Sequence, residues 1–244
     1  MARLRATFLF ALAAGFWLIN ACSPAEAQAW RSSPQNPIAN EVARFAPPMA
    51  TRQAWQAKPA LPGMKEQTPL AIILHHTGVA RNPKLPLEAK LRGLQAFSQR
   101  PGQVSPKRAK PAWPDVPYHY YIDYSGRIGE GRDVHYAGDT NTRYDTMNYI
   151  QIVVEGDFDT EIPAPEQIVA TRDLLAWLMV GWGVSKDKVS VHKDHAPTTC
   201  PGKNFMAALP GIVAAATEQR ARLISEICAQ SPKPVFASQY CGAK

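Results

Sequence analysis

The sequence predicts one α/β domain with a mixed central β-sheet flanked by helices. Two observations lead to this class. Short apolar runs rich in branched residues, which are typical of buried strands, alternate along the chain with longer segments of helical periodicity. Of the 244 residues, 45% are hydrophobic and 19% are charged, which are the proportions of a globular protein. Strands and helices that alternate in this way form an α/β sheet.

The predicted strands are short. The first is the apolar run 70–74 (LAIIL), which leads into the pair His75 and His76. Ser125 and Gly126 are turn residues between two strand-like segments, so we predict a hairpin there. Together the expected strands cover residues 70–74, 118–123, 127–130, 149–155 and 188–192.

Three segments have helical periodicity. Residues 86–99 place three leucines and Phe97 on one face. Pro165 is expected to open a second helix, because an N–H in the first turn would have no partner in any case. The glycines at 181 and 183 are expected to end that helix. The third predicted helix covers residues 212–228, and the segment rich in Pro and Lys at 100–117 is predicted to be a loop.

The first 27 residues are predicted to be an export signal. Arg3 and Arg5 precede an apolar run at 8–21 that is too short to span a bilayer. Two routes stay open: cleavage after Ala27, or lipidation of Cys22 in the lipobox-like sequence INAC. The protein is therefore expected to be exported. It would be either soluble, in the periplasm or secreted, or a lipoprotein of the outer membrane or cell surface that is attached through Cys22.

The rest of the chain divides by composition. Residues 28–62 hold six prolines and little periodicity, so they are predicted to be a leader that wraps around or tethers the remainder. Residues 63–210 are expected to be the main domain, and 211–244 a C-terminal helix and tail. Cys228 and Cys241 lie in this tail, and in an exported protein a disulfide between them is the plain interpretation.

The charge limits the choice of partner. The formal net charge is +7, and removal of residues 1–27 leaves +6. A basic surface favours anionic partners such as cell-wall polymers, nucleic acid or lipid headgroups. Nucleic acid is not expected, because no dense run of Lys and Arg alternates with aromatic residues.

Residues with metal-binding side chains lie at or just after two predicted strand ends. His75 and His76 close the first strand, His192 closes the last, and Cys200 follows eight residues later. Neighbouring strand residues point to opposite faces, so only one of His75 and His76 can face a given pocket. Two imidazoles and a thiolate suit zinc and leave a fourth position open, as in catalytic sites. The alternative is that these are ordinary polar residues, which is also how His119, His135 and His195 are interpreted.

Several segments, in the same order along the chain, resemble the type-2 N-acetylmuramoyl-L-alanine amidases and peptidoglycan recognition proteins. The resemblance covers about residues 51–206, and its most specific part is the last segment. The segments are TRQAWQAKP at 51–59, ILHHT at 73–77, WPDVPYHY at 113–120, GRIGEGR at 126–132, EGDF at 155–158 and VHKDHAPTTCPG at 191–202.

The resemblance implies a function and a site. In this family zinc is bound by residues that match His75, His192 and Cys200. A catalytic tyrosine matches Tyr118, and a Thr or Lys two residues before the cysteine matches Thr198. The activity implied is zinc-dependent hydrolysis of the amide bond between N-acetylmuramic acid and L-alanine in peptidoglycan, with residues 63–210 as the catalytic domain. The partner is then peptidoglycan or its muropeptides, and we expect a monomer.

Other interpretations stay open. Tyr118 could be a packed aromatic residue, and Thr198 a hydroxyl that caps a loop. Many relatives carry Glu where Val153 stands here; Glu155, on the same strand face, is either a substitute proton acceptor or a surface charge. The protein could bind peptidoglycan without cutting it, although non-catalytic relatives typically lose the cysteine that Cys200 matches. It could also be a metal-free thiol hydrolase, with Cys200 as nucleophile and a histidine, His192 or His195, as base.

Overall fold

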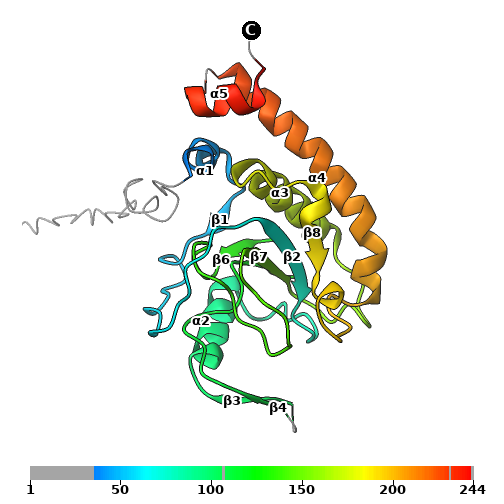
Figure 1. The fold of residues 1–244 in the computed structure, drawn as a ribbon. Coiled ribbons are helices and arrows are strands. Elements are labelled where there is room, and N and C mark those ends of the chain that lie inside the picture. The colour runs from blue at the N-terminus through cyan, green and yellow to red at the C-terminus, as the bar shows by residue number, and fades with distance from the viewer. Residues whose placement is uncertain (1–35, 106–107, 231, 243–244) are drawn as a thin grey trace, which may run out of the picture.

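Six strands of the described residues form one mixed sheet in the order β1-β6-β5-β7-β2-β8. The structure is a computed structural model that describes residues 36–105, 108–230 and 232–242 (Figure 1). The sheet strands are β1 (Met49–Ala50), β2 (Ala71–His76), β5 (Tyr120–Ile122), β6 (Ile128–Glu130), β7 (Tyr149–Val154) and β8 (Val189–Val191). The predicted mixed α/β domain is confirmed.

Parallel pairing brings the carboxyl ends of several strands to one edge of the sheet. β2 lies between β7 and β8 and is parallel to both, and β7 is also parallel to β5. Only the β5–β6 pair, the predicted hairpin, is antiparallel within this sheet. Since the carboxyl ends of parallel strands meet at the same edge, residues that follow β2 and β8 become neighbours.

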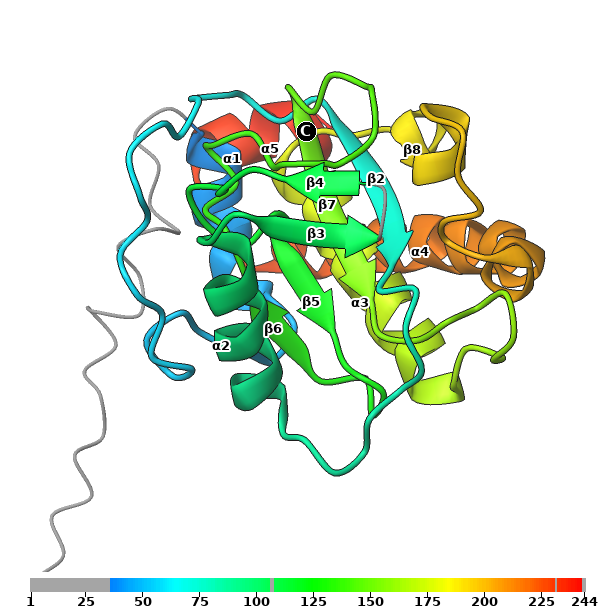
Figure 2. The same ribbon diagram turned by 90° about the horizontal axis from the view of Figure 1, so that it is seen from below.

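The two faces of the sheet are covered differently (Figures 1 and 2). Helix α3 (Pro165–Gly181) covers one face, and the main core forms there from side chains such as Ile72, Leu74 and Ile152. Helix α2 (Leu87–Ser98) covers part of the other face, where it packs with Trp55 and Val153. Near-continuous apolar strands such as β2 and β7 are expected where both faces are buried.

The segment predicted as a loop at 100–117 contains a hairpin instead. Strands β3 (Gly102–Ser105) and β4 (Arg108–Lys110) pair antiparallel beyond the end of α2, and Figure 1 shows them at the end of the molecule opposite the C-terminal helix. The Lys110 ammonium stabilises the base of this hairpin. It is buried, donates to the carbonyls of Ser98, Arg100 and Pro111 at 2.7–2.8 Å, and lies over the ring of Trp113. The prediction failed because this stabilisation is tertiary. Phe97, predicted on the buried face of α2, is 41% exposed and lies beside the same ammonium.

The last helix is longer than predicted. Helix α4 (Lys203–Ala229) begins nine residues before the expected start and continues through Pro210. Its first turns are held by the buried Phe205 ring, which stacks on Phe158 at 5.4 Å. Burial of the first turn thus outweighs the hydrogen bond that proline cannot donate.

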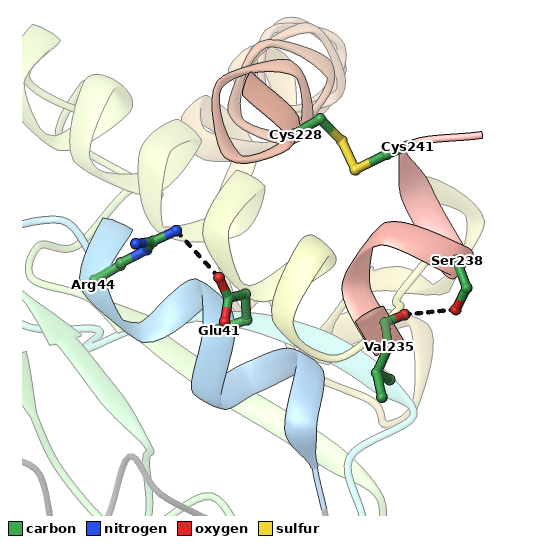
Figure 3. The surroundings of a disulfide bond; sticks show 6 residues. All are labelled: Glu41, Arg44, Cys228, Val235, Ser238 and Cys241. Atoms are coloured by element: carbon green, nitrogen blue, oxygen red, sulfur yellow. Dashed lines mark hydrogen bonds and ion pairs between the residues drawn. A yellow bond between two sulfur atoms is a disulfide. The ribbon is translucent and has the colours of Figure 1, made fainter. Parts of the chain in front are cut away.

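The tail ends in a further short helix, α5 (Pro234–Tyr240). A disulfide between Cys228 and Cys241 joins the end of α4 to the residue after α5 (Figure 3). α5 is also fixed by the fully buried Phe236 and by the Tyr240 hydroxyl, which donates to the Val180 carbonyl of α3 at 3.0 Å. In Figure 1, α5 lies at one end of the molecule, and β2 and β8 point toward the opposite end.

The described part of the predicted leader wraps around the domain. Helix α1 (Pro37–Val42), followed by a 3-10 turn (Ala43–Phe45), packs against α3, where the Trp177 indole donates to the Val42 carbonyl at 3.0 Å. Strand β1 then adds to the edge of the sheet beside β6. The expected export signal, Cys22 included, lies outside the described residues. Among the helices that the structure describes, none has the length and apolar character needed to cross a membrane.

Candidate metal centre

The His75 and His76 side chains point to opposite faces of the sheet. His75 lies in β2 opposite Val153 of β7, on the face that α2 partly covers. His76 lies on the α3 side, where its Nδ1 accepts the N–H of Phe158 at 3.2 Å. The alternation of strand residues therefore assigns one histidine to the candidate site and the other to packing, as predicted.

The loop after β8 folds back and carries Cys200 toward His75. His192 begins a 3-10 turn (His192–Asp194), and the N–H of Lys193 donates to the Cys200 carbonyl at 2.9 Å. The His76 N–H donates to the Cys200 sulfur at 3.3 Å. These backbone contacts fix the loop, so the eight-residue gap closes as the sequence predicts.

His75, His192 and Cys200 come together into one cluster. Their ligand atoms all lie within 4.8 Å of one another, and Nδ1 of His75 is 3.8 Å from the sulfur of Cys200. Two tetrahedral zinc ligands with bonds of about 2.0–2.3 Å lie roughly 3.5 Å apart. His75 and Cys200 are buried and His192 is half-buried.

Two further observations test whether a metal fits here. The Nε2 atom of His75 is buried without a hydrogen-bond partner among the described residues, which is costly for an imidazole that serves only in packing. Burial, and then the charge of His192, lower the pKa of His75 well below its usual value. Burial raises the pKa of the Cys200 thiol to about 12. A neutral imidazole can bind a metal without first losing a proton. A buried thiol becomes a thiolate only when a cation lies beside it, so this donor set fits zinc.

Tyr118 and Thr198 flank this cluster. The Tyr118 ring lies 5.2 Å from that of His75, and burial raises the pKa of its phenol, which keeps the hydroxyl protonated as a donor. The Thr198 hydroxyl accepts the N–H of Cys200 at 3.2 Å, and so helps to shape the loop that holds the thiol.

Glu155 is not a surface charge. It is buried, and its carboxylate receives the Lys90 ammonium at 2.7 Å and the N–H groups of Asn82 and Tyr124 at 2.9 and 2.8 Å. All its donors come from neighbouring segments, so Glu155 ties together the loops that follow β2, β5 and β7. The interpretation as a surface charge was therefore wrong, because it did not anticipate a buried lysine on α2.

The other histidines have structural contacts. His119 bridges β7 and the loop after β6: its Nδ1 accepts the N–H of Gln151 at 2.7 Å and its Nε2 donates to the Tyr136 carbonyl at 2.9 Å. His135 pairs with Asp133 at 2.7 Å, and His195 bonds the Ser190 hydroxyl at 2.8 Å. These contacts agree with their interpretation as ordinary polar residues.

One segment at the cluster was not anticipated. The loop between β6 and β7 places the Thr142 hydroxyl 2.7 Å from Nε2 of His192, and the Tyr144 ring 5.3 Å from the His192 ring. The sequence there has neither strand nor helix periodicity and no spacing typical of ligands, so no signal singled these residues out.

Comparison with known proteins identifies the family. A family model described as N-acetylmuramoyl-L-alanine amidase (Amidase_2) matches residues 65–203. Peptidoglycan-recognition protein SD of Drosophila simulans is 28% identical over 175 residues, which cover 66% of this chain and 84% of that protein. The N-acetylmuramoyl-L-alanine amidase of Homo sapiens is 23% identical over 177 residues, which cover 69% of this chain but 29% of that protein.

Solved structures give the same fold. The crystal structure of Drosophila peptidoglycan recognition protein SD superposes with a TM-score of 0.58 at 26% identity, covering 66% of this chain and 92% of that one. The N-acetylmuramoyl-L-alanine amidase LysC of Clostridium intestinale superposes with a TM-score of 0.55 at 25% identity, covering 69% of this chain and 97% of that one.

Proposed function

The chain belongs to the Amidase_2 family of N-acetylmuramoyl-L-alanine amidases, and on this premise we propose that it is a zinc-dependent amidase of peptidoglycan. Its reaction would be hydrolysis of the amide between the lactyl group of N-acetylmuramic acid and L-alanine. The observation that carries the proposal is the convergence of His75, His192 and Cys200, which supply three ligands with no fourth among the described residues.

The chemistry divides between the metal and the chain. Held by His75, His192 and Cys200, zinc would polarise the scissile carbonyl and lower the pKa of water from about 15.7 to roughly 7. The Tyr118 ring lies beside His75 and its phenol stays protonated, so its hydroxyl would donate to the oxygen on which negative charge develops. Thr198 supports the loop that presents Cys200 and is a second candidate donor.

A binding protein without activity is the first alternative, because relatives named recognition proteins share this fold. What favours catalysis is the complete set of three ligands, Cys200 included. A protein that only holds the glycan peptide needs no orphaned imidazole and buried thiol next to a phenol donor.

The thiol-hydrolase alternative has less support. Nucleophilic cysteines act as thiolates and are partly exposed. Cys200 is buried, and burial raises the pKa of its thiol to about 12. His195, one of the proposed bases, bonds Ser190 instead, and Nδ1 of His75 faces the sulfur at 3.8 Å.

We also propose export as the cellular context, since the substrate class lies outside the membrane. Cleavage after Ala27 would release a soluble enzyme, whereas acylation of Cys22 would anchor it. Mass spectrometry of the mature N-terminus separates the two routes: a chain that begins at Gln28 rules out the anchor, and an acylated Cys22 establishes it.

Digestion of purified sacculi tests the proposed activity. We expect the mature protein to release free stem peptides that begin with L-alanine and to leave glycan strands with unsubstituted lactyl groups, both identified by mass. Cys200→Ser is the control and should release neither. Retention of the protein on sacculi without any released peptide would favour the binding protein, and fragments cut at another bond would contradict the amidase.

A further inference from the structure

The candidate ligand His192 is contacted by a loop that has no assigned role in the proposed reaction. Residues 138–148, between β6 and β7, cross to the far edge strand of the sheet. There the Thr142 hydroxyl lies 2.7 Å from Nε2 of His192, 50 residues away in the sequence. A contact over this separation depends on the fold as a whole and does not follow from local chain geometry.

The Thr142 hydroxyl is itself held in place. Its oxygen lies 2.8 Å from that of Thr140, and the N–H of Thr142 donates to the same Thr140 oxygen at 3.1 Å. The hydroxyl of Thr142 can therefore give its proton to Thr140 while its lone pair accepts a proton from His192. The local turn thus allows Thr142 to accept a proton from His192.

The same loop covers the His192 ring. Tyr144 packs against it with the ring centroids 5.3 Å apart, and its hydroxyl reaches the Oε1 atom of Gln151 at 3.4 Å. His192 is only half-buried and lies in a turn beyond the end of β8, whereas His75 is buried within β2. The orientation of His192 therefore depends on contacts with this loop.

On the basis of the proposed function, we infer that Thr142 is a positioning residue for the metal ligand His192. A ligating imidazole binds through one nitrogen, and an acceptor on the other nitrogen fixes the tautomer and the ring orientation. With the Nε2–H of His192 donating to Thr142, Nδ1 would be the nitrogen left for the metal. Serine can make the same contact, and valine, which has nearly the shape of threonine, cannot.

The test measures zinc affinity by competition with a chelator of known affinity, on the mature protein and three variants. Thr142→Val should bind zinc about 10–100-fold more weakly, which is the usual cost of losing such a contact. Thr142→Ser should stay close to the wild type. Thr146→Val is the matched control, because the Thr146 hydroxyl of the same loop donates only to the Gly138 carbonyl. It should leave the affinity unchanged.

A second readout separates positioning from general loss of structure. With Co²⁺ in place of zinc, the visible absorption bands should change in Thr142→Val and not in Thr146→Val, while thermal unfolding of the metal-free proteins stays similar. Equal affinity of the wild type and Thr142→Val would overturn this inference and leave the amidase proposal standing, as would an equal loss in Thr146→Val. A wild type that binds no zinc would overturn both.

Discussion

The Lys90 ammonium of α2 and the Glu155 carboxylate after β7 form an ion pair of 2.7 Å in the interior, with side chains 6% and 4% exposed. Glu155 also accepts two backbone N–H groups from other loops. The pair therefore connects the helix on one face of the sheet to the loops at its carboxyl edge, which is the edge that carries the candidate metal centre.

Removal of one partner of this pair should be costly. In Glu155→Gln the Lys90 ammonium stays buried without a counter-charge, and we expect a loss of about 3–5 kcal/mol in the free energy of unfolding. Denaturant unfolding measures it. The control is Glu218→Gln, whose partner Arg222 lies 4.0 Å away with both side chains about three-quarters exposed, and it should change stability by less than about 0.5 kcal/mol. Similar losses in both variants would show that Glu155 has no special role.

Gly202, which follows the Cys200 loop, should not tolerate a side chain. Its φ is +90°, and a Cβ there would lie 2.4 Å from the backbone of Phe158. Gly202→Ala should therefore destabilise the protein and weaken zinc binding. Gly211→Ala, within α4 and with open space around it, should be neutral or stabilise by up to about 1 kcal/mol. A Gly202→Ala protein with wild-type stability and zinc affinity would contradict the observed loop geometry.

The buried His119 predicts a pH dependence of stability. Burial lowers its pKa from 6.5 to about 4. As the pH falls from 6.5 toward 4, the unfolded chain binds a proton at this position and the native protein does not, so stability is lost over this window. The loss is about 3 kcal/mol at most. Denaturant unfolding of metal-free protein at pH 7 and pH 4.5 should show a larger decrease for the wild type than for His119→Gln. Equal decreases, or an ordinary His119 pKa in an NMR titration, would refute the assignment.

Tyr118→Phe should keep zinc and lose turnover. Loss of one oxyanion donor costs roughly 2.7–4 kcal/mol, or 100- to 1000-fold in kcat, and we expect this scale or less because Tyr118 is only half-buried and water can partly replace its hydroxyl. Tyr240→Phe removes a hydroxyl that bonds Val180 on α3 and should leave kcat unchanged. An unaltered kcat in Tyr118→Phe would reduce this residue to a packing role.

The parts of the fold that were predictable are those with a local signal. β2 and β7 are continuous apolar strands because both of their faces are buried, and α3 begins at Pro165 as predicted. The β3–β4 hairpin was not predicted because it depends on the buried Lys110. The start of α4 was placed too late because a proline such as Pro210 usually indicates the end of a helix.

In the candidate site, too, the residues with a local sequence signal were predictable and the tertiary contacts were not. His75, His192 and Cys200 were predictable because parallel strands bring their carboxyl ends together and an eight-residue loop can return to them. The contact of Thr142 with His192 was not, because it joins an irregular loop to a distant turn. The pairing of Glu155 with Lys90 could be predicted only if the position of α2 on the sheet were known, and no residue spacing in the sequence indicates that position.

We propose that His75, His192 and Cys200 hold a zinc ion on which amide hydrolysis depends. Metal analysis of the purified mature protein, combined with hydrolysis assays before and after chelation, is the decisive measurement. We predict one zinc per chain, loss of hydrolysis when the metal is removed, recovery when zinc is restored, and reduced zinc with no hydrolysis in Cys200→Ser. Full hydrolysis by protein stripped of metal would rule out a zinc-dependent reaction at these residues.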